Sequence, residues 1–297
     1  GHDGHVAMLL AAARILMQFR AELNGAVKLC FQQAEEQGGG TAELLEHLAA
    51  FPIRGAFAIH LWSEIASGRV CAQAGARMAA CDNFEIVIDG IGCHGATPQR
   101  GVDPIVAAAA LVGHASTLMT REIDPAHAAA LTFGKFQSGH AANVIPERAL
   151  LAGSLRTTDK SDQAHLHAAL HRMVEATAAT FRVRAELTIR RGGPMLINEP
   201  RSSALAARCV TGLFGAASLI DFPALMVSEN FGDFLDRYPG MLALVGAGSE
   251  RCGATFPHHH PEFNIDEDAL SMGAALHAEY ALRALADATG ADSAPGW

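Results

Sequence analysis

Val27-Lys-Leu-Cys-Phe31 and Gly55-Ala-Phe-Ala-Ile-His60 are the two short apolar runs that decide the fold. Between them, residues 41–50 have the pattern of a helix, with Thr41 as the expected N-cap. A strand, a helix and a second strand in this order are typical of a mostly parallel sheet, whose functional sites lie at the carboxyl ends of the strands. The sequence therefore predicts an α/β fold with a site at the end of these runs.

Further elements of the same kind flank this segment. Residues 5–19 are rich in helix formers and apolar nearly all round, which predicts a buried helix. The last third of the chain returns to alternating elements. We expect helices at 202–213, 230–237 and 266–285 and strands at 224–227 and 241–246. Residues 287–297 are expected to form a loose tail.

The middle of the chain has a different pattern. It predicts strands at 84–89, 131–137, 149–157 and 183–190 and helices at 103–119 and 161–181. Asp103, followed by proline, has the features of an N-cap. The resulting order is β-α-β-β-α-β, which is typical of a ferredoxin-like fold. We therefore expect a catalytic domain formed by residues 1–80 and 193–297, with a ferredoxin-like domain inserted at 81–192.

The composition excludes several classes of partner. The 297 residues carry a formal net charge of −9, and no basic run is present. Binding to nucleic acid or to an anionic membrane surface needs clustered Lys and Arg, so neither is expected. No apolar run approaches the ~20 residues of a membrane span. The six cysteines form no Cys-x-x-Cys pair, and we expect reduced thiols in a cytoplasmic protein.

The sharpest chemical feature is the adjacent pair Glu35-Glu36. Hydrolysis at a metal site needs one carboxylate as a ligand and another as a base that moves a proton. The histidines at positions 2, 60 and 259 could complete such a site, because imidazole and carboxylate are ligands of Zn, Mn, Co and Ni. Taken singly, each of these residues also has an ordinary explanation as a solvated or hydrogen-bonded side chain. Their shared position at predicted strand ends favours a metal site.

Eight short motifs, in this order and spacing, resemble the amidohydrolase/metallopeptidase family of hippurate hydrolase, the indole-acetyl-amino-acid hydrolases and the aminoacylases. The resemblance covers essentially the whole chain. The motifs are Gly1-His-Asp-Gly-His5, Phe31-Gln-Gln-Ala-Glu-Glu-Gln37, His60-Leu-Trp62, Gly92-Cys-His-Gly-Ala-Thr-Pro98, Asn143-Val-Ile-Pro146, Gly153-Ser-Leu-Arg156, Ser228-Glu-Asn-Phe231 and His259-His-Pro-Glu-Phe263.

The resemblance implies a two-metal catalytic domain with a ferredoxin-like lid through which two chains form a homodimer. Glu35 is implied to be the general base and acid. His94 is implied to reach into the partner subunit's site and to stabilise the oxyanion. The implied ligands of the two divalent metal ions (Mn, Zn, Co or Ni) are His2, Glu36, His60 and His259.

Other positions match motif residues with less direct roles. Asn143 and Arg156 are implied to contact the substrate, and an Arg fork suits a substrate carboxylate because it binds bidentately. We expect Asp3 to orient a histidine rather than to bind metal. Glu229 is expected to support the site, although Asn230 stands where the family usually has Asp.

The function implied is hydrolysis of the amide bond of an N-acyl amino acid, such as a benzoyl- or acetyl-amino acid. Two alternatives stay open: a catalytically silent family member that binds small molecules as a dimer, and a dipeptidase-type exopeptidase. The family usually has a cysteine ligand immediately before the position of Gly1 and further strands upstream. We therefore expect an N-terminally incomplete member of the family.

Overall fold

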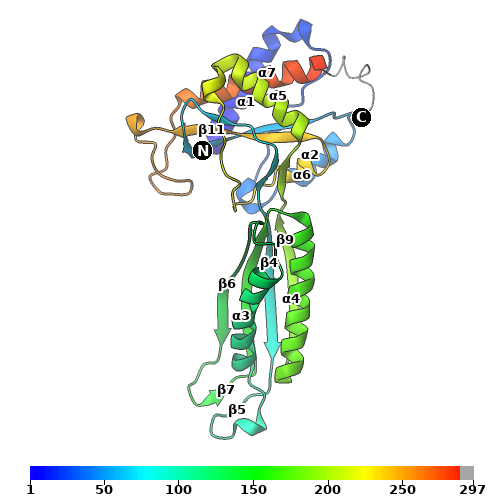
Figure 1. Ribbon diagram of the computed structural model, residues 1–297, viewed down its shortest axis with the longest axis vertical. Coiled ribbons are helices and arrows are strands. Elements are labelled where there is room, and N and C mark those ends of the chain that lie inside the picture. Colours follow the sequence, from blue (N-terminus) through cyan, green and yellow to red (C-terminus); the bar gives the residue numbers. More distant parts are fainter. Residues whose placement is uncertain (288–297) are drawn as a thin grey trace. The chain divides into compact units, whose positions relative to one another are not determined.

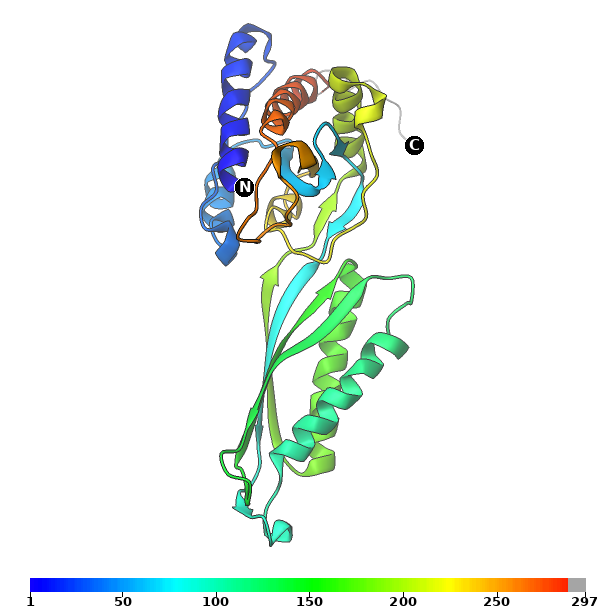
Figure 2. The same ribbon diagram turned by 90° about the vertical axis from the view of Figure 1, so that its left-hand side faces the viewer.

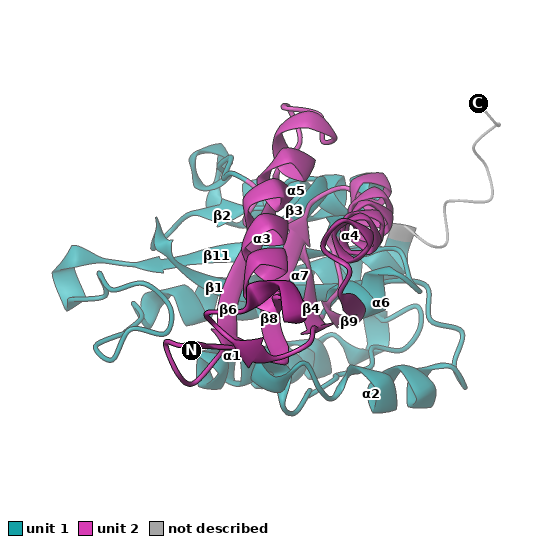
Figure 3. Ribbon diagram, turned by 90° about the horizontal axis from the view of Figure 1, so that it is seen from below, with its two compact units in different colours: residues 1–77, 197–223, 231–297 teal, residues 78–196, 224–230 magenta. Residues whose placement is uncertain are grey.

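The computed structural model describes residues 1–287 and divides into two compact units. Unit 1 contains residues 1–77, 197–223 and the chain from 231 onward, and unit 2 contains residues 78–196 and 224–230 (Figure 3). The chain passes between the units within β3 (Gly75–Met78) and β10 (Leu196–Asn198). The tail predicted at residues 287–297 lies, beyond Asp287, outside the described residues.

Unit 1 contains a three-stranded sheet with the order β1-β11-β2. β1 (Ala56–Ala66) runs parallel to β11 (Gly240–Gly248), with Ala56 opposite Gly240 and His60 opposite Leu244. β2 (Val70–Cys71) pairs with β11 in the antiparallel direction. The sheet is therefore mixed, and β1 lies at its edge. Every residue of β11 from 240 to 247 is buried, as expected for a central strand.

Helices cover this sheet in unit 1. α1 (His2–Gln18) packs along α7 (Asp268–Asp287), which also contacts α5 (Pro200–Phe214) and both long strands (Figure 1). Met8 of α1 is fully buried in the same cluster as Leu61 and Val245. α2 (Thr41–Leu48) and the short α6 (Gly232–Leu235) enclose a smaller cluster around Phe234.

Several predictions for this unit are wrong in detail. Residues 27–31 do not form a strand, because a strand exists only when a neighbour takes its backbone hydrogen bonds, and no described strand lies beside them. The N-cap of α2 is Gly40, not Thr41, whose hydroxyl instead donates to Asp233 Oδ2 at 2.8 Å. His60 lies in the middle of β1 and not at its end, since pairing with β11 extends the strand to Ala66.

The last third of the chain also differs from the prediction. Residues 224–227 form only an isolated bridge, between Met78 and Leu225. The helix predicted at 230–237 is limited to α6, and the final helix begins at Asp268 rather than at residue 266. The helix predicted at 5–19 begins earlier, at His2.

Unit 2 contains a four-stranded antiparallel sheet with the order β6-β8-β4-β9. Its strands are β4 (Ala80–Asp89), β6 (Ala129–Ser138), β8 (Arg148–Thr157) and β9 (Arg184–Gly193). Along β4, Phe84, Ile86 and Ile88 are buried while Asn83 and Glu85 are exposed, which confirms the predicted alternation. With its two helices the unit follows the order β-α-β-β-α-β.

Both long helices of unit 2 lie on one face of its sheet, as Figure 2 shows. α3 (Pro104–Arg121) begins after Asp103, whose side chain accepts from the N–H of Ile105 at 2.8 Å, so the predicted cap is confirmed. α4 (Lys160–Phe181) is capped in the same way by Asp159. At the end of β4, the short strands β5 (Cys93–His94) and β7 (Val144–Ile145) pair with each other. In residues 1–287 no helix has the length and apolar character required to cross a membrane.

Candidate metal centre

Glu36 lies between two imidazoles in unit 1. Its Oε1 atom is 3.8 Å from Nε2 of His2 and 3.7 Å from Nε2 of His259. The first turn of α1 presents His2, the short 3-10 helix Glu35–Gln37 presents Glu36, and the loop before α7 presents His259. Three segments that are far apart in the sequence therefore bring their ligand-type atoms together.

Glu35 joins the same group beside Glu36, because the donor atoms of His2, Glu35 and Glu36 all lie within 4.8 Å of one another. Its Oε2 atom is 3.8 Å from Nε2 of His2, and only 28% of its side chain is exposed, compared with 49% for Glu36. Adjacent residues in a 3-10 turn point in different directions, so the two carboxylates reach one nitrogen from separate positions. Glu36 lies between two imidazoles, which suits a ligand, and Glu35 beside it is the candidate for proton transfer.

The loops that carry Glu35, Glu36 and His259 contain backbone conformations that are rare for non-glycine residues. Ala34 and His259 are two of the three described non-glycine residues with positive φ, at 56° and 65°. Such conformations cost free energy and are enriched at functional sites. Gly40 closes the turn at a φ of 84°, where a Cβ atom would lie 2.2 Å from the carbonyl oxygen of Gln33. The loop that presents Glu35 and Glu36 is therefore held in one unusual shape.

His60 has a tautomer that suits metal binding. Its Nδ1 atom lies 2.6 Å from the carbonyl oxygen of Leu61, which only accepts hydrogen bonds, so Nδ1 carries the proton. The lone pair of Nε2 is then available to a metal ion. Burial lowers the pKa of His60 to about 4, which keeps the ring in the neutral form that metals bind.

Two further histidines contribute to the cluster, and our sequence reasoning did not assign them a role. His5 and His258 pack against His60 with ring centroids 4.5 and 5.4 Å away. His5 accepts a hydrogen bond from the N–H of Leu61, and His258 accepts one from the N–H of Ser63. A signal was present for His5, which lies three residues after His2 and so on the same face of α1.

The pair distances around Glu36 suit a divalent cation. Ligand atoms that lie ~2.0–2.2 Å from one ion are at most ~4.4 Å from each other. The separations of 3.7 and 3.8 Å around Glu36 fall within that limit. The donor atoms of His2, Glu35 and Glu36 lie within 4.8 Å of one another, and so do those of His2, His5 and His60. His2 belongs to both groups, so its ring nitrogens lie close to the carboxylate pair as well as to His60.

The two remaining supporting residues, Asp3 and Glu229, belong to different units. Asp3 is exposed, with 92% of its side chain accessible, and its carboxylate lies 3.1 Å from the amino nitrogen of Gly1. Glu229 is half-buried and belongs to unit 2. The orienting role expected of Asp3 is carried out, for His60, by the carbonyl of Leu61.

Unit 2 brings His94 and Asn143 together. His94 of β5 stands opposite Val144 of β7, and the N–H of Gly95 donates to the carbonyl of Asn143 at 2.8 Å. The His94 ring accepts from the N–H of Ala96 at Nδ1. In the neutral ring the proton is therefore on Nε2, which leaves an exposed N–H donor.

Arg156 lies in β8 of the four-stranded sheet, at the end of β4 that is away from β5. It stands opposite Cys81 at the start of β4, whereas β5 follows the end of β4 at Asp89. Eight residues of strand span roughly 27 Å. Arg156 is half-buried and donates from Nη1 to the carbonyl of Met226 at 2.7 Å, which leaves the other side of the guanidinium fork for a carboxylate.

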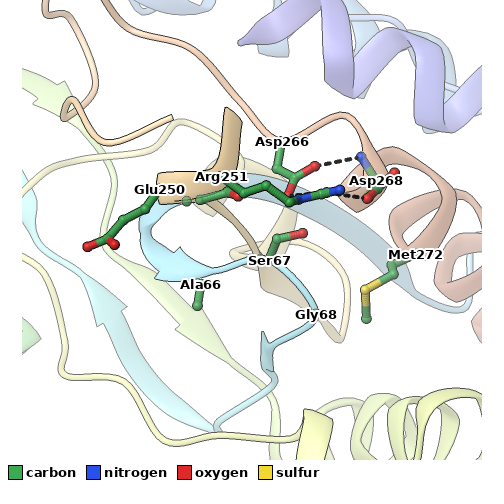
Figure 4. A pocket seen from close by; sticks show the side chains of 10 residues that line it. Ala66, Ser67, Gly68, Glu250, Arg251, Asp266, Asp268 and Met272 are labelled. Atoms are coloured by element: carbon green, nitrogen blue, oxygen red, sulfur yellow. Dashed lines mark hydrogen bonds and ion pairs between the residues drawn. The ribbon is translucent and has the colours of Figure 1, made fainter. Parts of the chain in front are cut away.

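A separate hollow of about 560 Å³ lies where β1 and β11 end in unit 1 (Figure 4). Three of its charged residues are paired with one another: Arg251 contacts Asp268 at 2.7 Å and Asp266 at 3.5 Å. Asp266 also accepts from the N–H of Asp268 at the start of α7. These contacts fix the beginning of a helix, and we assign the hollow no catalytic role.

The fold and this cluster define an α/β protein with a carboxylate–imidazole centre for divalent metal. Comparison with known sequences is more specific: residues 1–283 match the model of peptidase family M20/M25/M40, and the chain belongs to that family. The predicted amidohydrolase/metallopeptidase family is thereby confirmed, and so is its hydrolase class.

Individual relatives show the same relationship. The chain is 35% identical to an IAA-amino acid hydrolase of Arabidopsis thaliana, covering 100% of this chain and 68% of the relative. It is 33% identical to an N-acetyl-L-cysteine deacetylase of Bacillus subtilis, covering 96% and 67%. Among solved structures, a Bacillus subtilis protein described as a dinuclear metal-binding peptidase of the M20 family matches with a TM-score of 0.83, 28% identity and coverage of 96% and 72%. The chain thus spans about two thirds of the length of these curated relatives.

Proposed function

We propose that this chain forms the metal-dependent site of an amidohydrolase that cleaves N-acyl amino acids into a carboxylate and an amino acid. One observation carries the proposal. Oε1 of Glu36 lies between the Nε2 atoms of His2 and His259, while Glu35 approaches the same His2 nitrogen from another side. A ligand carboxylate and a base carboxylate, side by side, are what amide hydrolysis at a metal centre requires.

The ligands in this proposal are His2, Glu36, His60 and His259, and the proposed content is two ions per site. A bound divalent ion would supply Lewis acidity, which polarises the amide carbonyl and lowers the pKa of a water molecule. Mn, Zn, Co and Ni all accept this mixture of imidazole and carboxylate ligands. The dinuclear description of the Bacillus subtilis relative supports the count of two.

Glu35 moves the proton in this scheme. Its carboxylate accepts a proton from the attacking water and returns it to the nitrogen of the leaving amine. The side chain is suited to both steps because it is 28% exposed and lies 3.8 Å from a ligand nitrogen, so it is close to the ions. His94 donates from Nε2 to the oxyanion that develops on the carbonyl oxygen, since its Nδ1 is already engaged by Ala96.

Arg156 and Asn143 are the proposed substrate contacts. The guanidinium of Arg156 binds the carboxylate of the amino-acid part, which distinguishes an N-acyl amino acid from a simple amide. The names of two relatives, an IAA-amino acid hydrolase and an N-acetyl-L-cysteine deacetylase, support substrates of this class.

The positions of His94 and Arg156 support a dimer. Arg156 stands opposite Cys81 at one end of β4 and His94 follows its other end, with roughly 27 Å of strand between Cys81 and Asp89, so a small substrate cannot touch both in the same chain. We therefore propose that residues 81–192 act as a lid and dimerisation domain, and that His94 serves the site of a second copy. A cytoplasmic location is proposed from the buried thiols of Cys71, Cys81 and Cys209.

The test compares Glu35→Gln protein with the parent chain after both are loaded with metal. We expect Glu35→Gln to keep its metal content and to lose at least about 100-fold in kcat on an N-acyl amino acid, as is typical when an acid–base group is removed. Glu43→Gln, on the exposed face of α2, is the matched control and should leave the rate unchanged. A full rate in Glu35→Gln would refute its role. A parent chain that binds no metal would favour the silent relative, and cleavage of dipeptides alone would favour the exopeptidase.

A further inference from the structure

Two histidine side chains hold the peptide groups of Leu61. The N–H of Leu61 donates to Nε2 of His5 at 3.0 Å, and the carbonyl of Leu61 accepts from Nδ1 of His60 at 2.6 Å. The rings of His5 and His60 meet edge to face, with centroids 4.5 Å apart and an interplanar angle of 70°. A single residue of β1 therefore connects a histidine of α1 to a proposed metal ligand.

The hydrogen bond to Leu61 also decides what His5 can do. Its Nε2 lone pair is occupied by the N–H of Leu61, so the proton of the neutral ring is on Nδ1. Neither nitrogen then offers a lone pair to a cation, although His5 lies within 4.8 Å of the donor atoms of His2 and His60. His5 is thus placed beside the ligands without being able to act as one.

The position of β1 explains why these contacts form. β1 is at the edge of its sheet, and alternate N–H groups of an edge strand point away from the neighbouring strand. The N–H groups of Leu61 and Ser63 are two residues apart and therefore point in the same direction. His5 takes the first, and His258 takes the second at 3.3 Å. Imidazole nitrogens thus replace the carbonyl groups of an adjacent strand.

We propose that His5 is a positioning residue: by accepting the Leu61 N–H it fixes the peptide whose carbonyl sets the tautomer and ring orientation of His60. The proposal rests on the proposed function, because that function makes His60 a metal ligand. Partners that orient a ligand histidine in this way typically contribute 10–100-fold to metal affinity.

The experiment uses two substitutions at one position. His5→Met removes the acceptor at similar volume, whereas His5→Gln can place an amide oxygen near the position of Nε2 and so keep it. Titration with Zn²⁺ alone, followed by calorimetry, should show affinity weakened about 10–100-fold in His5→Met and within a few-fold of the parent in His5→Gln. An equal loss of Zn²⁺ affinity in both variants would identify His5 as a ligand. Unchanged affinity in both variants would show that His5 has no role in metal binding. Both results overturn the proposal.

A second readout needs no metal. In the metal-free protein, hydrogen exchange of the Leu61 amide should be about 10-fold faster in His5→Met than in the parent and in His5→Gln, because loss of one hydrogen bond of ~1.4 kcal/mol corresponds to that factor. His277→Met is the matched control, since it removes another buried imidazole of unit 1 that packs against Phe57. It should leave the Leu61 amide protected.

The two readouts separate this proposal from the proposed function. A parent chain that fails to bind Zn²⁺ while its Leu61 amide depends on His5 would refute the metal function and keep the hydrogen-bonded connection. A Leu61 amide that exchanges equally fast in the parent and in His5→Met would refute the positioning role whatever the metal affinity.

Discussion

Oε1 of Glu36 lies 3.7 Å from Nε2 of His259, although the two residues come from opposite ends of the chain. The loop that carries Glu36 and the loop that carries His259 both contain a residue with positive φ, at Ala34 and at His259 itself. This contact closes the proposed metal centre, because it joins the ligands of α1 and of the 3-10 helix Glu35–Gln37 to those of the C-terminal segment. Its removal should have a direct effect on metal binding.

We therefore predict that Glu36→Ala weakens binding of Zn²⁺ by at least about 100-fold, more than is typical for loss of an outer partner. Loss of a coordinating carboxylate also removes a negative charge that offsets the charge of the ion. Metal content after dialysis, measured by elemental analysis, checks the prediction. Glu43→Ala is the control, and retention of parent metal content in Glu36→Ala would show that Glu36 is no ligand.

Mixed dimers test the proposed contribution of His94 to a second copy. When His94→Ala and Glu35→Gln chains are mixed in equal amounts and allowed to exchange, half of the dimers contain one chain of each kind. Each of these dimers has one complete site, so the mixture should recover about a quarter of the parent activity in a symmetric dimer. The separate variants should stay inactive. A mixture as inactive as its components would mean that His94 acts within its own chain, and full activity of His94→Ala by itself would mean that His94 has no role.

Acid stability should depend on His277. Burial among apolar groups lowers the pKa of His277 to about 4 from the ordinary 6.5, with Phe57 and Tyr280 packed nearby. Above pH 6.5 the ring is neutral in both the folded and unfolded states, and no free energy is lost. As the pH falls below 6.5, only the unfolded state binds the proton, so the free energy of unfolding decreases until the pH reaches about 4.

His277→Met should remove this part of the pH dependence. We expect the parent chain to lose about 3 kcal/mol more stability than the variant between pH 7 and pH 4, as an upper figure. Urea unfolding at a series of pH values provides the measurement. Parallel curves for the two proteins would mean that His277 is solvated or paired in solution.

Asp82 is the buried charge of unit 2. Its Oδ2 atom accepts from Gln163 and from His167, both at 2.7 Å and both on α4, while Oδ1 is buried without a hydrogen-bond partner in the described part of the chain. Asp82→Ala would leave two donors of α4 without their acceptor and should cost roughly 2–3 kcal/mol.

Asp89 provides the matched comparison on the same strand. It pairs with Arg148, but both side chains are partly or largely exposed, at 35% and 67%. Asp89→Ala should therefore change the free energy of unfolding by less than about 1 kcal/mol. Thermal unfolding of the two variants distinguishes these cases. Equal losses of stability in the two variants would indicate that the hydrogen bonds of Asp82 do not stabilise the packing of α4 on the sheet.

Much of unit 2 could be predicted because its signals are local. An Asp followed by Pro, as at Asp103, favours the start of a helix without help from distant residues. The alternation along β4 shows which face of the strand is buried. In unit 1 the same reasoning was wrong for residues 27–31, because an apolar run becomes a strand only beside a partner. The end of β1 was also wrong, since pairing with β11 and not the apolar run sets its length.

For the candidate site, the residue types indicated metal-dependent hydrolysis, because carboxylates and imidazoles are ligands of divalent metals, and the family motifs implied which residue has which role. Tertiary structure decided which of them meet. It brought Glu36 to His259, left Asp3 exposed, and placed His94 and Arg156 toward opposite ends of β4. It also recruited His5 and His258, because backbone groups at a sheet edge need acceptors and a sequence does not reveal which side chains will reach them.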